Sequence, residues 1–305
     1  MKTKSHGQEV WFYDNGRYEK ETICAEGWMR FLYENPLGKA TLLSLVKRKA
    51  TSRLYGAWCR TGLSAKSIPE FIGQNGVDMA GCVGPYRSFA DFFSREKAGI
   101  SFPGGADILG SPCEGLALAY NDINPQKLIA AKGAHYSLAQ LLGSSKLANT
   151  FDGGVMMAIR LTPSNYHRAH FFDDGVVKAT KVIDGDLYSV SPLALGKVAR
   201  LYCQNKRAVT LFSSENFGNI ALVEVGATFV GSIVHSFEAG DRVTRGQQMS
   251  YFLPGGSLLL VFFKKGEFTP DPTLLEQTLA GYETKVRVGQ PLGTRNLELR
   301  NGRTS

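Results

Sequence analysis

The chain has 305 residues, of which 43% are apolar and 20% are charged, and its formal net charge is +8. A chain of this length and composition can bury a sizeable core, which excludes a largely disordered protein. The positive charge favours an anionic partner, either a nucleic acid, an acidic substrate or an anionic membrane surface. The N-terminus is too polar for a signal peptide, and no apolar run reaches the roughly 18 residues that cross a bilayer. We therefore expect the protein on the cytoplasmic side of the membrane.

The five cysteines are scattered along the chain and never form a Cys-x-x-Cys pair. This spacing predicts neither a disulfide framework nor a zinc site. We expect reduced cysteines with a structural role.

Residues 1–105 are predicted to form an N-terminal, mostly helical region close to a membrane. After a polar lead-in, apolar residues recur at helical spacing until prolines and glycines interrupt them. Ser67 and Glu70 have the Ser-x-x-Glu spacing of a capping box, in which each side chain bonds the backbone of the other residue. The expected helices cover 27–35, 37–49, 53–60, 68–73 and 89–95.

The second and third of these helices have two readings. In the first reading, the apolar faces of these helices pack on the body of the protein and the basic residues are solvated. In the second, the helices contact a membrane. In the second reading aromatic and aliphatic side chains enter the interface and basic residues meet lipid phosphates. The expected membrane-contact residues are Lys47, Arg48, Lys49 and Trp58.

From residue 106 onward the sequence consists of short apolar runs separated by Gly, Asn, Asp and Pro, which is typical of antiparallel β structure. The expected strands are 115–120, 155–161, 176–183, 209–212, 220–225, 232–237 and 258–263, with short helices at 138–142 and around 192–200. Glycine-rich turns in 225–233 and 239–247 favour a compact barrel-sandwich. The predicted fold class is therefore α+β, with an N-terminal helical segment and an antiparallel β-rich, barrel-sandwich-like catalytic domain over 106–305.

Two histidines, His167 and His170, follow a strand end and a proline turn. A third metal ligand is not evident near them, so we expect no metal site and consider acid–base chemistry instead. Glu114 lies in a tight turn before a strand, where a rigid carboxylate can orient a histidine and stabilise its protonated form.

Ser257 follows the turn Pro254-Gly255-Gly256 and begins the most apolar run in the chain. One reading is an ordinary turn before a buried strand. The other is a self-cleavage site, where the hydroxyl attacks the preceding carbonyl and Gly256 permits the strained backbone. Glu114, His170 and Ser257 supply an acid, a histidine and a serine, but the chain lacks the Gly-x-Ser-x-Gly elbow of many serine hydrolases. This combination favours attack on the chain's own backbone.

Over nearly its whole length the chain resembles the bacterial, pyruvoyl-dependent proenzymes of the phosphatidylserine decarboxylase family. The motifs that carry the resemblance are Ser88-Phe89-Ala90-Asp91-Phe92-Phe93-Ser94-Arg95, Ser111-Pro112-Cys113-Glu114-Gly115, Tyr166-His167-Arg168-Ala169-His170, Tyr188-Ser189-Val190-Ser191-Pro192, Val225-Gly226-Ala227-Thr228-Phe229-Val230-Gly231-Ser232-Ile233 and Gly255-Gly256-Ser257. Each motif is weak alone, but their order and spacing are highly specific.

The resemblance implies autocatalytic cleavage between Gly256 and Ser257, with a pyruvoyl cofactor formed from Ser257. The mature enzyme would then decarboxylate phosphatidylserine to phosphatidylethanolamine as a peripheral protein on an anionic membrane surface. The two cleaved chains are expected to stay associated, and the resemblance is compatible with a homodimer. By family position, His170 with Glu114 serves self-cleavage and His167 serves decarboxylation, although the two histidines are interchangeable in this assignment.

Four positions depart from the family pattern. Glu114 replaces the usual aspartate, Leu258 replaces a hydroxyl residue, and Gln247 and Gln248 replace two carboxylates. These departures leave open an uncleaved paralogue that only binds anionic lipid. A decarboxylase of a soluble amino acid is a second alternative. Net charge alone supports a nucleic-acid binder, so we expect no nucleic-acid partner.

Overall fold

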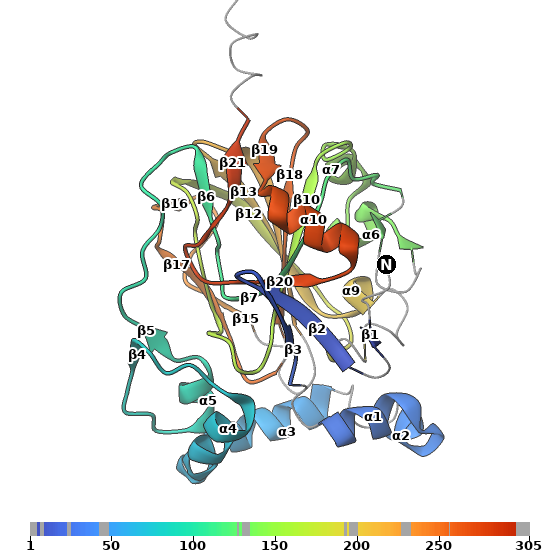
Figure 1. The fold of residues 1–305 in the computed structure, drawn as a ribbon, viewed down its shortest axis with the longest axis vertical. Coiled ribbons are helices and arrows are strands. Elements are labelled where there is room, and N and C mark those ends of the chain that lie inside the picture. Colours follow the sequence, from blue (N-terminus) through green and yellow to red (C-terminus); the bar gives the residue numbers. More distant parts are fainter. Residues whose placement is uncertain are drawn as a thin grey trace, which may run out of the picture.

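The computed structural model describes residues 5–6, 9–22, 26–42, 49–126, 128–129, 135–191, 194, 201–226, 233–255 and 257–296. Figure 1 shows a row of helices along the bottom of the view, drawn in blue and cyan, beneath a body of sheets that contains most of the remaining chain. The predicted α+β class is therefore confirmed. Within the described residues the sheets remain open and do not close into a barrel.

The row of helices corresponds to the predicted N-terminal helical segment. It consists of α1 (Glu26–Glu34), α2 (Pro36–Thr41), α3 (Lys49–Cys59), the 3-10 helix η2 (Gly62–Ser67), α4 (Ile68–Asn75) and α5 (Phe89–Phe93). The Ser88 hydroxyl accepts a hydrogen bond from the backbone of Asp91 and so caps α5, as its sequence position predicts. Apolar residues of α3, α4 and α5 share one small core that includes Phe89, Phe92 and Phe93.

The capping box predicted at Ser67 is wrong. Ser67 is the last residue of η2 and has helical backbone angles, so its hydroxyl turns back and donates to the carbonyl of Ser64 at 2.7 Å. The α4 helix begins instead with Pro69 in its first turn and ends at Gly76, which adopts a left-handed conformation.

One large sheet organises the body. Its strand order is β1 (Ser5–His6), β2 (Glu9–Asp14), β20 (Glu283–Val286), β7 (Gly115–Tyr120), β10 (Val155–Leu161), β18 (Ser257–Phe263), β14 (Gly218–Gly226), β13 (Arg207–Ser214), β12 (Gly175–Ile183) and β16 (Arg242–Val243), with β3 (Arg17–Lys20) paired to β2. The β2–β20 pairing is parallel and the other pairings are antiparallel. The predicted antiparallel β region is thus confirmed.

Four smaller sheets and four helices follow or border this large sheet along the described chain. The sheets are β11 (Arg168–His170), β17 (Gln248–Phe252) and β15 (Ile233–His235); β19 (Phe268–Pro270), β21 (Pro291–Arg295) and β6 (Ile108–Gly110); β4 (Cys82–Val83) with β5 (Glu96–Lys97); and β8 (Leu128–Ile129) with β9 (His135–Tyr136). The helices are α6 (Leu138–Leu142), α7 (Ser145–Asn149), α9 (Leu201–Gln204) and α10 (Pro272–Ala280). Most of the expected 192–200 helix and the 227–232 part of the glycine-rich stretch lie outside the described residues.

The β18 strand is buried on both faces, since all seven of its residues are buried. Leu258, Leu260 and Phe262 belong to a core cluster that includes residues of α1 and α6. Leu259, Val261 and Phe263 belong to a second cluster, which includes aromatic residues and part of the β11–β17–β15 sheet. Because side chains alternate along a strand, the Ser257 side chain shares its face with this second set.

The two ends of the described chain meet in the large sheet. The β2–β3 hairpin turns at Asn15 and Gly16, both with positive φ, and β2 pairs with β20 from the C-terminal part. The N-terminal region is therefore joined to the β body by strands as well as by the helices. The predicted boundary near residue 105 stays a prediction.

Candidate active site

Ser257 stands at the head of the most buried strand in the large sheet. Its exposed fraction is 1%, and it lies between Leu161 of β10 and Gly226 of β14. Gly256 lies outside the described residues, whereas Pro254 and Gly255 line a cavity next to this strand end. The serine that the sequence singles out is thus held rigidly beside a space that a ligand can enter.

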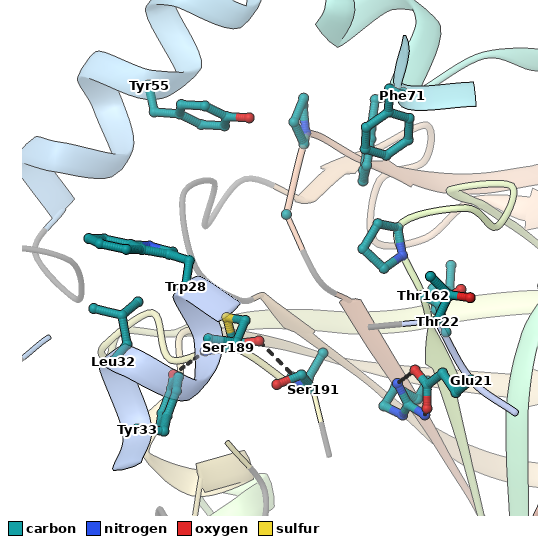
Figure 2. Close-up of a pocket in the computed structure, with 18 of the residues that line it drawn as sticks. Glu21, Thr22, Trp28, Leu32, Tyr33, Tyr55, Phe71, Thr162, Ser189 and Ser191 are labelled. Carbon is teal, nitrogen blue, oxygen red and sulfur yellow. Dashed lines mark hydrogen bonds and ion pairs between the residues drawn. The ribbon is translucent and has the colours of Figure 1, made fainter. Parts of the chain in front are cut away.

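That cavity has a volume of about 230 Å³ and separates the N-terminal helices from the sheet. Figure 2 shows Trp28 and Tyr55 across the cavity from Thr162 and Glu21. Its lining is mainly aromatic and aliphatic, and Glu21 and Arg160 are the two charged side chains in it. A pocket with an apolar wall and a few polar groups fits an amphipathic small molecule.

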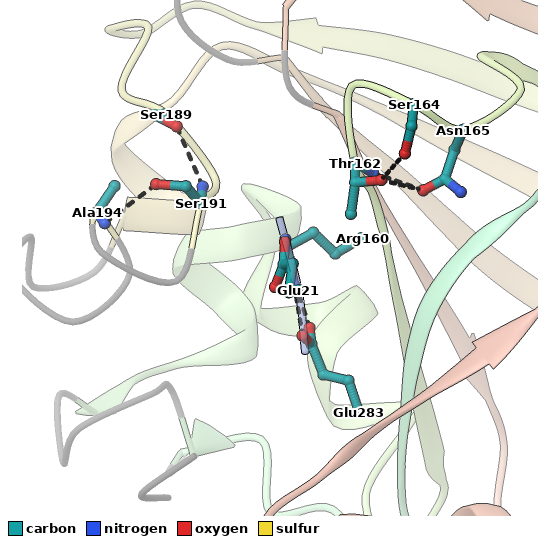
Figure 3. Close-up of polar contacts among 9 residues, drawn as sticks. All are labelled: Glu21, Arg160, Thr162, Ser164, Asn165, Ser189, Ser191, Ala194 and Glu283. Atoms are coloured by element: carbon teal, nitrogen blue, oxygen red, sulfur yellow. Dashed lines mark hydrogen bonds and ion pairs between the residues drawn. The ribbon is translucent and has the colours of Figure 1, made fainter. Parts of the chain in front are cut away.

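The charged end of the cavity is a buried ionic cluster of Arg160, Glu21 and Glu283, visible in Figure 3. Arg160 donates from Nη1 and Nη2 to the two oxygens of Glu21, both at 2.8 Å, and from Nε and Nη2 to Glu283 at 3.0 and 2.5 Å. The cluster links the end of the N-terminal hairpin, β10 and β20. Sequence reasoning missed it because the partners are far apart, although an arginine inside the apolar run 155–161 was a signal.

Attraction between the opposite charges of this cluster offsets part of the cost of burying them. Burial alone lowers the pKa of Arg160, but the negative charges of Glu21 and Glu283 outweigh that effect and hold the pKa above its ordinary value. Burial raises the pKa of Glu283, and the attraction of Arg160 does not fully offset the rise. One guanidinium is shared between two carboxylates, so the cluster depends on Arg160.

A turn at residues 162–165 forms the wall between the apolar cavity and a second, more polar one of about 260 Å³. The side-chain oxygen of Asn165 accepts from the backbone and hydroxyl of Thr162, at 2.7 and 2.8 Å (Figure 3). Arg95 donates to the carbonyls of Ser164 and Asn165, each at 3.0 Å. These bonds fix the turn that leads from the partner strand of Ser257 to the two predicted catalytic histidines.

His167 is fully buried and stacks on Phe93 with ring centroids 4.0 Å apart. Its Nε2 donates to the carbonyl of Thr162 at 3.0 Å, which leaves Nδ1 as an acceptor. Nδ1 is buried and has no hydrogen-bond partner within the described residues. Burial, with a smaller contribution from the charge of Arg95, lowers the pKa of His167 to about 3. His167 is therefore a neutral histidine with one bare nitrogen.

His170 has both ring nitrogens occupied. Nδ1 lies 2.9 Å from the carbonyl of Gly246 and donates to it, and Nε2 lies 3.1 Å from the hydroxyl of Tyr166. Burial lowers the pKa of His170, which favours the neutral ring. The backbone N–H of His170 donates to the carbonyl of Pro112 at 2.8 Å, so the histidine segment lies against the turn that carries Glu114.

Glu114 points toward the polar cavity. It accepts from the side-chain amide of Asn165 at 2.9 Å and lies 4.0 Å from the ammonium of Lys97. The predicted contact between Glu114 and His170 is not among the hydrogen bonds of the described residues, nor is a bond from either to Ser257. The structure thus brings the three segments together without joining their side chains, and the predicted roles stay predictions.

Leu258, which replaces the hydroxyl residue of the family pattern, is buried and lies opposite Arg160 and Val225. Its side chain is therefore on the other face of the sheet from that of Ser257. The amide oxygen of Gln248 accepts from Arg168, and its nitrogen donates to Ser236 at 2.8 Å. The glutamine here acts as a structural link between β17, β11 and the segment after β15.

The predicted membrane-contact residues are only partly described. Lys47 and Arg48 lie outside the described residues, and Lys49 begins α3 without a described side chain. Trp58 is 45% exposed. Other apolar side chains of this region are also exposed, namely Trp28, Leu37, Leu54 and Leu63. Among the described residues, none of the helices has the length and apolar character needed to cross a membrane.

Comparison with known proteins places this site in a family context. The family profile described as phosphatidylserine decarboxylase matches residues 89–294. A phosphatidylserine decarboxylase proenzyme of Clostridium botulinum is 38% identical, over 92% of this chain and 97% of its own length. Proenzymes of the same name from Clostridium perfringens and Clostridium beijerinckii are each 39% identical, over 91% and 92% of this chain and 96% of their own lengths.

The buried cluster predicts a large effect of Arg160→Met. The change leaves two buried carboxylates without a cation, so we expect the free energy of unfolding at pH 7 to fall by about 3–5 kcal/mol. Chemical denaturation measures it, with every variant carrying Ser257→Ala so that all chains are uncleaved. Adding Glu21→Gln and Glu283→Gln to Arg160→Met should recover most of the lost free energy of unfolding. An Arg160→Met protein as stable as its parent would contradict the interpretation.

His167 predicts a loss of stability in acid. Its pKa is about 3 in the folded protein and near 6.5 when unfolded, so only the unfolded chain gains the proton between these values. The free energy of unfolding should therefore fall as pH drops below about 6.5. His167→Gln, in the same Ser257→Ala background, should lose about 2 kcal/mol less than its parent between pH 7 and pH 5. Equal losses would show that His167 is not held neutral.

Proposed function

Because the chain belongs to the phosphatidylserine decarboxylase family, a family of decarboxylating enzymes, we propose that it is a proenzyme. It cleaves itself between Gly256 and Ser257 and then converts phosphatidylserine to phosphatidylethanolamine and carbon dioxide. The observation that carries the proposal is the position of Ser257, buried at the head of a central strand and next to a turn that lines the apolar cavity.

Self-cleavage needs two proton removals. In the first, Ser257 Oγ loses its proton and bonds to the Gly256 carbonyl carbon; the peptide C–N bond breaks, and the nitrogen gains a proton. In the second, the Cα proton of residue 257 leaves and its electron pair forms a Cα=Cβ double bond. The Cβ–Oγ bond then breaks, releasing Gly256 as a carboxylate. Water converts the unsaturated residue to a pyruvoyl group and ammonia.

The residues around Ser257 fit such a group. Its keto carbon supplies the electron sink that decarboxylation requires. Pro254, Gly255 and Leu161, the residue opposite Ser257, border the cavity, so a cut between Gly256 and Ser257 would lie next to the space where a substrate would bind. His167 has a bare, buried nitrogen and stacks on Phe93, which also lines the cavity. We assign His167 to proton transfer or positioning in decarboxylation, with its bare Nδ1 as the atom that accepts a proton.

His170 and Glu114 are the proposed pair for self-cleavage. Their support is the sequence pattern together with the bond from the His170 backbone to Pro112, which places the histidine next to the turn of Glu114. In the uncleaved chain, rotation of Glu114 away from Asn165 and of His170 away from Tyr166 would be required before they meet. The longer side chain of glutamate, compared with aspartate, extends its reach for that contact.

The substrate is proposed to enter from a membrane surface. The aromatic and aliphatic lining of the cavity suits acyl chains, and Trp28 both lines the cavity and is 47% exposed. Trp58, Leu54 and Leu63 add exposed apolar area on the same row of helices. We therefore propose a peripheral location on the cytoplasmic face of an anionic membrane, with the basic residues 47–49 near lipid phosphates.

Cleavage is tested by Ser257→Ala. The unchanged protein should separate on a denaturing gel into two chains, the smaller one beginning at a blocked residue 257 by intact mass. Ser257→Ala should remain one chain and release no carbon dioxide, because the nucleophile is absent. Ser213→Ala, a serine of β13 away from the cavity, should be processed normally.

Two results would overturn the proposal. A parent protein that stays full-length would support the uncleaved, lipid-binding paralogue. Processed protein that releases carbon dioxide from free serine but not from phosphatidylserine vesicles would support the soluble amino acid as substrate.

The membrane surface is tested by vesicle flotation with anionic lipid. Leu54→Ala/Trp58→Ala removes two exposed side chains, each worth about 1.5–3 kcal/mol when buried, so partitioning should fall at least tenfold. Leu279→Ala is the matched control, because Leu279 is 88% exposed but belongs to α10 on the β body. Changing Lys47, Arg48 and Lys49 to Ala should weaken binding in a salt-dependent manner. Equal partitioning of all variants would exclude this surface.

A further inference from the structure

A second histidine–carboxylate pair lies on the strand next to β18. Glu224 of β14 is fully buried, and one of its oxygens lies 2.6 Å from Nε2 of His235. Its other oxygen accepts from the hydroxyl of Ser250. His235 and Ser250 lie opposite each other on β15 and β17, so the small sheet presents both donors to the same carboxylate.

The register of the large sheet places this pair on the Ser257 face. Ser257 lies opposite Gly226, and Glu224 lies opposite Leu259. Side chains two residues apart on a strand share a face, so Glu224 and Ser257 are diagonal neighbours, with their Cα atoms about 7–8 Å apart. Gly226, which lies opposite Ser257, adds no side chain to this face.

Glu224 differs from the other fully described buried carboxylates in its partners. Asp173 pairs with Arg245, and Glu283 pairs with Arg160. Within the described residues the ion pairs of Glu224 include no arginine or lysine, and its basic partner is His235. The pair resembles the carboxylate and histidine of a serine hydrolase, in which the acid fixes the ring and stabilises it when protonated.

His235 is the basic side chain that contacts Glu224. The neighbouring strands place Ala208 and Leu259 opposite Glu224. The charge of Glu224 also acts on Cys113, whose pKa is raised by burial first and then by the charges of Glu114 and Glu224. In the tautomer whose Nε2 donates to this carboxylate, Nδ1 is left as the nitrogen that can accept a proton. The His235 side chain is 18% exposed, which gives a proton a route to solvent.

We propose that His235, oriented by Glu224, removes the Cα proton of residue 257 in the second step of self-cleavage. This inference rests on the proposed function and leaves the first proton removal to His170 and Glu114. The Cα proton passes to His235, the C–H electron pair becomes the Cα=Cβ bond, and the Cβ–Oγ bond breaks as Gly256 leaves with both carboxylate oxygens. Glu224 is a positioning residue, since it acts through His235.

Hydroxylamine trapping at neutral pH tests the assignment, because under these mild conditions the reagent cleaves an ester and leaves peptide bonds intact. Glu224→Gln should slow formation of the blocked small chain at least tenfold and accumulate a full-length species. Hydroxylamine should split that species into two chains, the smaller one starting at an unmodified serine. His235→Gln keeps an N–H donor toward Glu224 but cannot take a proton, so it should accumulate the same ester.

Matched controls separate this proposal from a purely structural role and from failure of the proposed function. Glu215→Gln changes an exposed carboxylate paired with Arg242 and should be processed at the parent rate. If His235→Gln is processed at the same rate as the parent protein, the His235–Glu224 pair has only a structural role. That result would overturn the inference. A full-length Glu224→Gln species that resists hydroxylamine also overturns it, provided that thermal unfolding shows a folded chain. His235→Ala replaces Glu224→Gln if the latter does not fold. An unprocessed parent protein would instead overturn the proposed function itself.

Discussion

The β18 strand has apolar partners on both faces, and this double burial is the constraint on which the rest of the structure depends. An interior strand can begin with a serine only if the layers around it hold that position firmly. The β10 and β14 strands flank it along its length, and helices and a small sheet cover its two faces. A bond cut at the head of such a strand would therefore be supported by the strands and layers around β18.

Charged residues interrupt the apolar strands on either side of β18, one on each face. Arg160 of β10 lies on the face of the cavity, where it meets Glu21 and Glu283. Glu224 of β14 lies on the face of Ser257, where it meets His235. Each is costly to bury and is offset by specific bonds. The two faces of the strand end thus differ chemically, with an apolar cavity and fixed ionic cluster on one side and a histidine–carboxylate pair on the other.

The local elements could be predicted from the sequence, because their apolar periodicity and end signals are contained within a few residues. The strands at Gly115–Tyr120 and Val155–Leu161 have the predicted bounds. The α10 helix was not predicted, although Asp271, Pro272 and Gly281 are ordinary start and stop signals for a helix. The box at Ser67 failed because a preceding 3-10 helix, which the pattern does not reveal, already uses its hydroxyl.

The site was predictable as a set of segments but not as a set of contacts. Ser257, His167 and Glu114 are recognisable by their local chemistry, whereas their partners come from distant parts of the chain. Asn165 takes the hydrogen bond that Glu114 was expected to share with His170, and Gly246 occupies a nitrogen of that ring. Which donor reaches Glu114 depends on the position of the 162–165 turn, whose carbonyls accept two hydrogen bonds from Arg95, and no local pattern encodes that position.

The position of the C-terminal part of the chain in the large sheet affects how the protein could fold before and after a cut. Residues after 256 supply the central β18 strand, together with β20 and Glu283, whereas Arg160, Glu21 and Asp14 lie before it. A cut at residue 256 would leave two chains, each of which contains only part of the same sheet and of the same ionic contacts. Folding is then a reaction of one chain, while refolding after the cut becomes an encounter of two. The mature protein would then keep the fold of its precursor because unfolding is slow, and not because the two chains can readily refold.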